Sequence, residues 1–381
     1  VPLPILDLSD SLDPKQAAEL FCKREASAEL DLVCGPLVKF VLIRLRADEH
    51  WLLHVAHHIN CDGASWDLYV EELGLLYEAK LRGDAPPLPE FTSPQYGDYA
   101  TWQRRLLSRA WPAYQTSVEW WRKYLSGASS TLELPFRRVH PQLEVNPSEG
   151  QFYWGIEPEI SRGLNVVASA ERATPYMVRL AAFAAILADV SGQPDVVFGG
   201  YISGRNRPEL QRMLGDFSNL VTLRFQYKPQ LSFFEWLSKV RDTMLAVQKH
   251  SLIPYEKLCD ELREIFQTPP QITALFHMTQ RYIPNKLANL EFTLLRRCEP
   301  VMPWGITVTH DGNDEVQECR VTFDANIHDP AGVRLFVDRY TRLLDAISHH
   351  PNCSLAQLMT MSQTGGRLDG LIGPSQQCPG W

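Results

Sequence analysis

The sequence predicts an α+β protein in which mixed strands and helices form two halves of comparable plan. Strand-like apolar runs and amphipathic helical runs occur in both halves, and no segment repeats at a fixed period. The chain has 381 residues, of which 45% are hydrophobic, and this is enough for two domains with cores of their own.

The first half covers residues 1–145 and would form the N-terminal domain. It opens with the strand-like run PLPILDLS and a helix near Pro14–Ser27. The run VKFVLIRLRADEHWLLHVA predicts the two strands of a hairpin, joined at Ala47–His50. A helix is expected from about Ser65, a good N-cap, because apolar residues recur at three- or four-residue steps. These residues are Trp66, Val70, Leu73 and Tyr77.

A proline-rich connector at 83–94 leads to two further helices, expected at 95–110 and 116–126. Four tryptophans in this region are expected to pack rather than to form a ligand cage. They are Trp102, Trp111, Trp120 and Trp121. Residues 127–150 lack a clear periodicity, and we interpret them as a linker.

The second half covers residues 146–361 and would form the C-terminal domain. Its strands are expected at 151–156, 195–202, 219–227, 271–278, 289–297, 304–310 and 317–325. Its helices are expected at 157–171, 175–190, 232–249, 254–265 and 330–349. The tail, residues 362–381, is rich in Gly, Pro and Gln, a composition typical of a linker.

Charge and composition exclude several classes of partner. The net charge of −8 argues against a phosphate-backbone ligand, so we expect no nucleic acid. No apolar run approaches the roughly 20 residues of a membrane helix, so we expect no membrane partner. Eight cysteines are scattered without a CxxC pair, which favours reduced thiols in a cytoplasmic protein. The chain opens abruptly on a strand-like run, and we interpret it as part of a larger protein.

Two histidines stand where the second hairpin strand runs out into a loop, in the stretch HVAHHINCDGASW. Side chains at such a point are held by the scaffold and remain open to a ligand. A neutral imidazole can accept a proton from an attacking amine or hydroxyl, and it can stabilise the charge of a tetrahedral intermediate. Of His57 and His58, we expect His58 to face the substrate.

The residues after the histidines each have a possible task, although such a pattern also arises by chance. Asp62 either orients the imidazole, as in a catalytic triad, or pairs with an arginine and holds the loop; the sequence leaves both open. Gly63 allows a sharp turn and the close approach of a substrate to the backbone. The helix start at Ser65 offers N–H groups to an oxyanion.

A metal site is the other chemistry that His and Asp side chains could support. His57 and His58 are consecutive on an extended segment and point to opposite faces, so only one of them can face a given site. Because no second His/Cys cluster offers the remaining ligands, we expect no metal.

Taken together, the motifs resemble those of the condensation domains of non-ribosomal peptide synthetases. HHINCDG fits the family's HHxxxDG, and YGDYATW at 96–102 fits YxDYAxW. The segment 204–224 fits the motif that ends in GxFxNTxxxR, with Asp216 in a slot that is often aromatic or small and Leu220 in place of Thr. HSLIPYEKL at 250–258 fits (H/N)xxxPFE, with Tyr in place of Phe. The motifs keep the family's order over nearly the whole chain.

The resemblance implies two chloramphenicol-acetyltransferase-like lobes in a V, with the HHxxxDG loop in the tunnel between them. It also implies amide bond formation. An upstream carrier protein presents an acyl or peptidyl thioester on its phosphopantetheine arm, and the amine of an aminoacyl group on a downstream carrier attacks it. The domain itself would bind no cofactor. Its partners would be the two carrier domains, with an adenylation domain among its neighbours.

The resemblance assigns the catalytic role to His58, within a motif that includes His57 and Gly63. Whether such a histidine acts as a general base or positions the amine and stabilises the intermediate is left open. Asp62 would be structural, and Arg205 is our candidate for its partner.

Two further residues are candidates for substrate binding. Asn219 matches the Asn of the FxN segment near the tunnel, and Ser65 lies at the helix start. Asn219 could equally close a turn at the entry to a strand. His250 lies at a helix end, where the helix dipole favours it, and we interpret it as structural.

The sequence departs from the family pattern in two regions. The family's early motifs are absent, which implies that the first segment of the N-terminal lobe is missing. The stretch MTQRYIPN at 278–285 is a poor match to the motif of that region, which bears on the handling of the carrier arm.

Rival functions within this fold are separated by their motifs. An epimerisation domain adds a glutamate motif that is absent here, and a cyclisation domain replaces the histidine motif with DxxxxD. A CoA-dependent acyltransferase carries a DFGWG loop, and MPWGIT at 302–307 matches this loop only in part. Two alternatives stay open: an ester-forming or other HHxxxDG acyltransferase, and a non-catalytic module of the same fold that recruits carriers. Such modules usually lose the histidines, so the presence of His57 and His58 favours catalysis.

Overall fold

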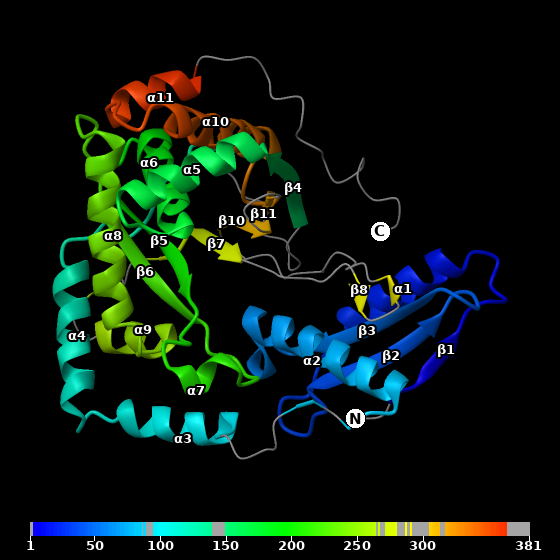
Figure 1. The fold of residues 1–381 in the computed structure, drawn as a ribbon. Helices are drawn as coiled ribbons and strands as arrows, with labels where there is room; N and C mark the ends of the chain where they lie inside the picture. The colour runs from blue at the N-terminus through cyan, green and yellow to red at the C-terminus, as the bar shows by residue number, and fades with distance from the viewer. Residues whose placement is uncertain are drawn as a thin grey trace.

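The computed structural model contains a three-stranded sheet, a six-stranded sheet and a two-stranded ribbon, joined and covered by helices (Figure 1). It describes residues 3–85, 87–88, 94–138, 149–263, 266, 271–279, 286–287, 290–291, 305–312 and 317–363. The predicted α+β class is confirmed. The two larger sheets belong to two parts that meet near the start of helix α2 and diverge from there in an open V (Figure 1).

The smaller part is built on strands β1 (Ile5–Asp7), β2 (Val38–Arg44) and β3 (His50–Ala56), which lie in that order. β2 and β3 form the predicted antiparallel hairpin, and β1 pairs with β2 in parallel. Helix α1 (Pro14–Ala26) packs on one face through Ala18 and Cys22, against Ile43 and Leu45. On the other face, helix α2 (Gly63–Arg82) stacks its aromatic rings on those of the hairpin.

The larger sheet has the strand order β4-β11-β10-β7-β5-β6. The strands are β4 (Glu149–Ile156), β5 (Asp195–Ile202), β6 (Asn219–Gln226), β7 (Ala274–Thr279), β10 (Ile306–Gly312) and β11 (Gln317–Asp324). β7 is parallel to both of its neighbours, and the other pairs are antiparallel. The short ribbon of β8 (Lys286–Leu287) and β9 (Leu290–Glu291) lies beside α2.

Helices cover one face of the larger sheet (Figure 1). They are α5 (Pro158–Ala170), α6 (Pro175–Ser191), α8 (Phe233–Lys249) and α10 (Pro330–His349), with α11 (Leu355–Gln363) beyond them. Alternate residues along the strands, such as Val221, Leu223 and Val308, share one core with these helices. α6 is buried on nearly all sides, which explains why its sequence is apolar throughout.

Helix α4 and the segment after it pack into the core of the larger part. Trp121 of α4 (Pro112–Leu125) is 1% exposed, and Leu132 and Phe136 are also buried there. The expectation of a linker at 127–150 is therefore wrong for 127–138, and residues 149–150 belong to β4. These apolar side chains pack in an irregular backbone, which produces no periodicity in the sequence. Residues 139–148 lie outside the described part, and the assignment of domains stays a prediction.

Most predicted elements are present, with shifted ends. Helix α2 begins at Gly63 rather than near Ser65, because the carboxylate of Asp62 is the N-cap and accepts the N–H of Ser65 at 2.8 Å. The helix expected from 116 begins at Pro112, whose fixed φ suits the first helical position, and α3 spans Tyr96–Leu106.

Helices α7 (Pro208–Gln211), α9 (Tyr255–Arg263) and α11 complete the described elements, and of these only α9 was expected. Much of the strand expected at 289–297 and the tail from 364 onward lie outside the described residues. Of the described helices, none is by itself long and apolar enough to cross a membrane, and α5 with α6 passes only as a pair bent by 101°.

The place of α4 in the larger core can be tested by replacing Trp121. We expect Trp121→Ala to lower the free energy of unfolding by about 3–5 kcal/mol, because it leaves a cavity in a packed interior. It also removes the hydrogen bond from the indole N–H to the carbonyl of His250, at 3.0 Å. Trp111→Ala is the matched control, since Trp111 is 46% exposed, and it should cost less than about 1 kcal/mol. Urea denaturation measures both, and equal losses would contradict this packing.

Candidate functional site

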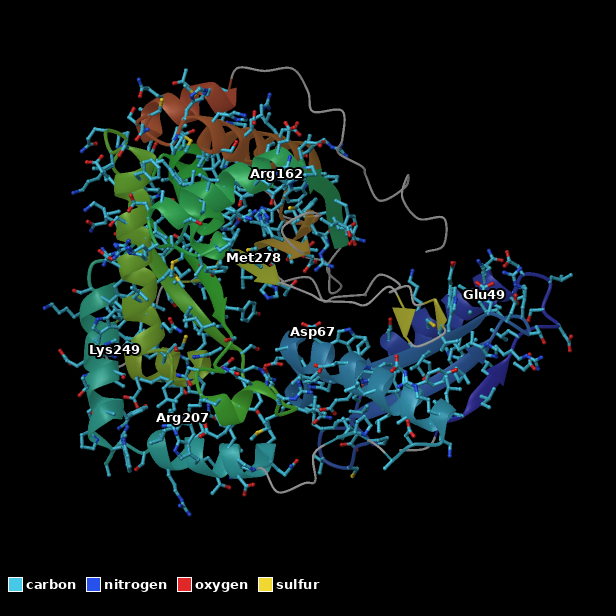
Figure 2. All side chains as sticks on the ribbon, in the orientation of Figure 1. Glu49, Asp67, Arg162, Arg207, Lys249 and Met278 are labelled. Carbon is cyan, nitrogen blue, oxygen red and sulfur yellow. The ribbon has the colours of Figure 1, made fainter. Side chains whose placement is uncertain are left out.

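The histidine motif lies at the junction of the two parts, where the chain leaves β3 and enters α2. His57 is extended, and its Nδ1 accepts the N–H of Ile59 at 3.1 Å, which starts a short 3₁₀ turn at His58–Asn60. The His58 side chain is 70% exposed. Side chains of α2, Asp67 among them, lie on the side of the smaller part that faces the six-stranded sheet and Met278 (Figure 2). The loop therefore holds an accessible imidazole between the two parts.

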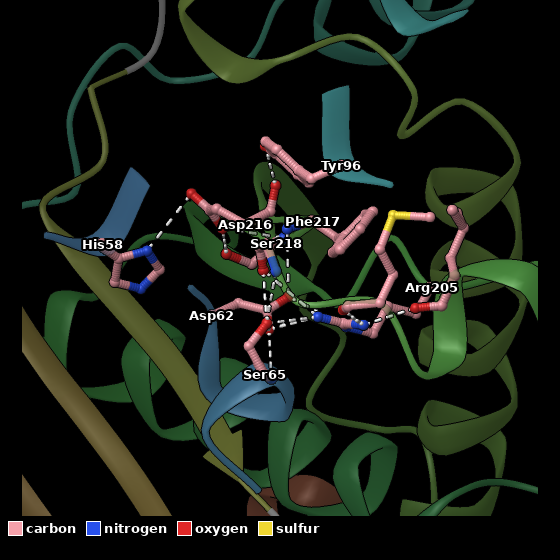
Figure 3. Close-up of polar contacts among 11 residues, drawn as sticks. His58, Asp62, Ser65, Tyr96, Arg205, Asp216, Phe217 and Ser218 are labelled. Atoms are coloured by element: carbon pink, nitrogen blue, oxygen red, sulfur yellow. Dashed lines mark hydrogen bonds and ion pairs between the residues drawn. The ribbon is translucent and has the colours of Figure 1, made fainter. Parts of the chain in front are cut away.

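Asp62 and Arg205 form a buried, bidentate ion pair beneath this loop (Figure 3). Arg205 Nη2 lies 2.8 Å from Asp62 Oδ1, and Arg205 Nε lies 3.2 Å from Oδ2. Their side chains are 6% and 5% exposed. The guanidinium also donates to the carbonyls of Leu210 and Met213 at 2.6 and 2.7 Å, so its charge is fully solvated by the protein.

The geometry decides between the two roles left open for Asp62. Its Oδ1 accepts from the N–H and hydroxyl of Ser65, and its Oδ2 accepts from the N–H of Phe217 at 3.2 Å. Both oxygens are thus occupied by loop-holding contacts in addition to Arg205. Asp62 holds the shape of the loop and does not orient the imidazole of His58. Arg205 occupies the place expected for its partner.

Ser65 is part of the same hydrogen-bond network. Its side chain is buried, and its hydroxyl accepts from Arg205 at 2.8 Å and from the N–H of Gly215 at 3.0 Å. The hydroxyl hydrogen has two acceptors within reach, Asp62 Oδ1 at 2.8 Å and the carbonyl of Gly215 at 2.7 Å. With its N–H and hydroxyl both engaged, Ser65 holds the loop in place, and substrate binding by Ser65 stays a prediction.

Gly63 also differs from its expected role in the turn. Its backbone is not in the positive-φ region, so the start of α2 does not require a glycine for its conformation. A Cβ built at Gly63 meets nothing within 4 Å, which leaves open the prediction that a substrate approaches the backbone there. Gly204, by contrast, has a φ of +65°, and a Cβ there would lie 2.0 Å from the carbonyl oxygen of Phe217, so this position requires glycine.

The YGDYATW motif packs against the connection between β5 and β6. The hydroxyl of Tyr96 donates to the carbonyl of Asp216 at 2.7 Å, and the rings of Tyr96 and Tyr99 contact Phe217. A Cβ at Gly215 would fall 2.0 Å from the Tyr96 ring, so this position has no room for a side chain. On its other side the Phe217 ring lies 4.3 Å from the guanidinium carbon of Arg205, a cation–π contact.

Asn219 joins the FSN segment to the HSLIPYE segment. Its amide nitrogen donates to the carbonyls of Ser251 and Ile253 at 2.8 and 2.7 Å, and its oxygen accepts the N–H of Tyr255 at 3.2 Å. Both amide hydrogens are therefore used to hold the turn before α9. This geometry supports the turn-closing role, and substrate binding by Asn219 stays a prediction.

His250 ends α8 and is buried, with its ring stacked on Trp120 at 4.6 Å. Its Nδ1 lies 3.1 Å from the hydroxyl of Ser117. Burial, followed by the nearby charge of Lys249, lowers the pKa of His250 below its usual value. The expected structural role fits this packing, and the lowered pKa favours the neutral ring over the charged one.

The structure brings one unexpected residue to His58. Asp216 Oδ2 lies 3.4 Å from His58 Nδ1 (Figure 3). The contact with Asp216 raises the pKa of His58, and partial burial offsets only part of this effect. For Asp216, burial acts to raise the pKa, but hydrogen bonds with His58 and Ser218 lower it by more. The only sequence signal for Asp216 was that a charged residue stands in a slot that is often aromatic or small.

Among the described residues, no group of three or more His, Cys, Asp and Glu is arranged to hold a metal ion. The site offers an exposed imidazole beside a carboxylate, on a loop held by a buried ion pair. Such an arrangement can accept a proton from an amine or hydroxyl and return it to a leaving group.

Comparison with known proteins places this arrangement in context. The sequence profile described as "Condensation domain" matches residues 1–367. One of the linear gramicidin synthase proteins of Brevibacillus parabrevis is 33% identical over 348 residues, which is 89% of this chain and 7% of that protein. The chain thus spans only a small part of the length of this curated relative.

Two solved structures show the same fold. The first condensation domain of the CDA synthetase has a TM-score of 0.77 and 22% identity, covering 94% of this chain and 77% of that one. The X-domain from teicoplanin biosynthesis, in its complex with OxyB, has a TM-score of 0.76 and 19% identity, covering 94% of this chain and 79% of that one.

The buried ion pair predicts a large and specific loss of stability. We expect Arg205→Ala to lower the free energy of unfolding by about 3–5 kcal/mol, because the charge of Asp62 stays buried without its partner. Arg205→Lys should also be destabilising, since an ammonium cannot replace the two-pronged contact. Arg207→Ala is the control: Arg207 is exposed and lies 4.9 Å over the ring of Trp102, a contact worth about 0.5–1 kcal/mol. Equal losses in urea denaturation for Arg205→Ala and Arg207→Ala would refute the role of the pair.

Proposed function

Because the chain belongs to the condensation-domain family, we propose that it forms peptide bonds between carrier-bound substrates in a non-ribosomal peptide or hybrid polyketide–peptide assembly line. The donor is an acyl or peptidyl thioester on an upstream carrier. The acceptor is an aminoacyl group on a downstream carrier. The observation that carries the proposal is the exposed ring of His58, set at the junction of the two parts on a loop fixed by Asp62 and Arg205.

The chemistry requires one proton to move. The neutral α-amine attacks the thioester carbonyl, a C–N bond forms, and the C–S bond breaks as the tetrahedral intermediate collapses. A neutral imidazole at His58 accepts the proton that the amine loses, and the departing thiolate takes a proton in return. The reaction balances without a further reactant, because the amine loses one proton and the leaving thiolate gains one.

Partners and setting follow from the same proposal. Phosphopantetheine arms of the two carrier domains deliver both substrates, and the domain binds no cofactor of its own. An adenylation domain is a neighbour in the same synthetase, and the reaction takes place in the cytoplasm. The similarity to one short part of a long synthase protein supports this arrangement.

The alternative of a non-catalytic module has one observation in its favour. The X-domain that was solved in a complex with OxyB shares the fold, so the fold is compatible with binding another protein. Against this alternative stands the exposed imidazole of His58 and its contact with Asp216. An ester-forming reaction would use His58 in the same way, with a hydroxyl in place of the amine.

The proposal predicts that transfer depends on His58. Two carriers are loaded with a thioester donor and an aminoacyl acceptor, and product on the downstream carrier is followed by intact mass in the full-length protein. His58→Ala should slow transfer by about 10²–10⁴-fold, the usual contribution of general acid–base catalysis. His50→Ala is the control, because His50 is exposed at the far end of β3 and should leave the rate unchanged.

Two outcomes would count against the proposal. Equal transfer by the wild type and His58→Ala would show that His58 is not essential to the reaction. Binding of both carriers with no transfer by either protein would favour the recruiting module. Replacing the amine of the acceptor by a hydroxyl in the same assay separates amide from ester formation.

A further inference from the structure

We propose that Asp216 is a positioning residue, which holds the His58 imidazole in one orientation and one tautomer with Nε2 facing the substrates. This inference rests on the proposed function of His58 and adds a residue to it. The contact between Asp216 Oδ2 and His58 Nδ1 joins residues that lie far apart in the sequence, at 3.4 Å. This distance is long for a hydrogen bond, and catalytic hydrogen bonds commonly tighten when substrates bind.

The carboxylate of Asp216 is oriented by its own neighbours. Its Oδ1 accepts the hydroxyl of Ser218 at 2.7 Å and the N–H of Ser218 at 3.3 Å. These contacts leave Oδ2 directed toward His58, as Figure 3 shows. The Asp216 side chain is 28% exposed and the His58 side chain is 70% exposed, so the carboxylate is the more enclosed of the two groups.

The backbone around Asp216 is tied to the histidine loop on both sides. The carbonyl of Gly215 accepts the N–H of Asp62 at 3.1 Å, and the N–H of Phe217 donates to Asp62 Oδ2 at 3.2 Å. The Tyr96 hydroxyl holds the carbonyl of Asp216 itself, at 2.7 Å. Because neighbouring residues on either side are fixed to the loop that carries His58, the carboxylate and the imidazole keep a defined relative position.

The chemistry of a carboxylate dictates the tautomer. An ionised carboxylate only accepts hydrogen bonds, so the ring nitrogen that faces Asp216 must carry a hydrogen. Nδ1–H then points to Asp216, and in the neutral ring the lone pair resides on Nε2, the nitrogen on the other side. This is the task that an aspartate performs in a catalytic triad. Asp62 cannot perform it here, because both of its oxygens are used by Arg205, Ser65 and Phe217.

The surroundings of His58 give the expected direction of the pH effect. Among the described residues, the charged groups that act on its imidazole are Asp216, from the β5–β6 connection, and more weakly Asp62, from the start of α2. Tyr96 of α3 binds the backbone of Asp216, and Arg205 neutralises Asp62. Because Asp216 raises the pKa of His58, its removal should let the imidazole lose its proton at a lower pH.

The inference is tested by Asp216→Asn, which keeps the size of the side chain and removes its charge. In the full-length protein, ¹⁵N spectra of the histidine side chains report the tautomer and titration of His58, identified by the signal that His58→Ala removes. We expect the Nδ1–H tautomer in the wild type, and a mixed tautomer and titration at lower pH in Asp216→Asn. The acid limb of the pH profile of kcat/KM should move to lower pH. The fall in kcat should be smaller than the roughly 10²–10⁴-fold loss expected when the imidazole itself is removed.

Two further variants separate positioning from a general structural effect. Asp242→Asn removes a carboxylate that is 68% exposed on α8, and it should change neither the spectra nor the rate. Ser218→Ala keeps the charge of Asp216 but frees its orientation, so it should lower kcat with a smaller change in the titration of His58. KM for the loaded carriers should change little in Asp216→Asn and Ser218→Ala, because the inference gives these residues a role in orienting His58 and none in binding carriers.

The possible failures can be told apart. If His58 keeps its tautomer and titration in Asp216→Asn, the positioning role is wrong, whatever the rate does. If the spectra change but neither kcat nor the pH profile of kcat/KM changes, the contact exists without a catalytic consequence. The inference is then equally overturned. If His58→Ala transfers as fast as the wild type, the proposed function of His58 fails first, and the spectra still decide whether Asp216 holds the ring.

Discussion

The buried ion pair between Asp62 and Arg205 is the interaction on which the site depends. Removing two charges from water is costly, and here the cost is offset by a bidentate contact and by hydrogen bonds to nearly every remaining polar atom of the pair. The pair joins the start of α2 to the β5–β6 connection, and therefore joins the smaller part of the molecule to the larger one. Together with the hydrogen bonds of Asp62 and Ser65 to Gly215 and Phe217, the pair fixes the segments that carry His58 and Asp216 relative to each other.

The four sequence motifs form a connected structure around this pair. Tyr96 of the YGDYATW motif donates a hydrogen bond to the backbone carbonyl of Asp216. The Phe217 ring packs between Tyr96 and Arg205. Asn219 then connects the same segment to the turn before α9. Asp62, Arg205, Asp216 and Asn219 are buried or half-buried supports, and His58 is an exposed group that they hold in place. This division explains why so many motif residues serve one imidazole.

Much of the fold follows from local patterns that the chain makes plain. The hairpin of β2 and β3, the buried helix α6 and the amphipathic helix α10 could be predicted, because each has a regular arrangement of apolar residues. The segment 127–138 could not, because Leu132 and Phe136 pack in irregular backbone with no period to detect. Helix α2 started earlier than predicted because a carboxylate at Asp62 caps it in preference to the hydroxyl of Ser65.

Patterns along the chain were enough to predict the α+β class, the order of the motifs, and the choice of His58 and Asp62 as candidates, and the family resemblance added Arg205. Each of these predictions depends on neighbouring residues or on a motif of fixed spacing. The packing of distant segments was needed to learn that Asp62 serves the loop, that Ser65 holds the loop in place, that Asn219 closes a turn and that Asp216 faces His58. These outcomes depend on distances between segments far apart in the chain. Such distances are set when the two parts pack together, and no local pattern records them.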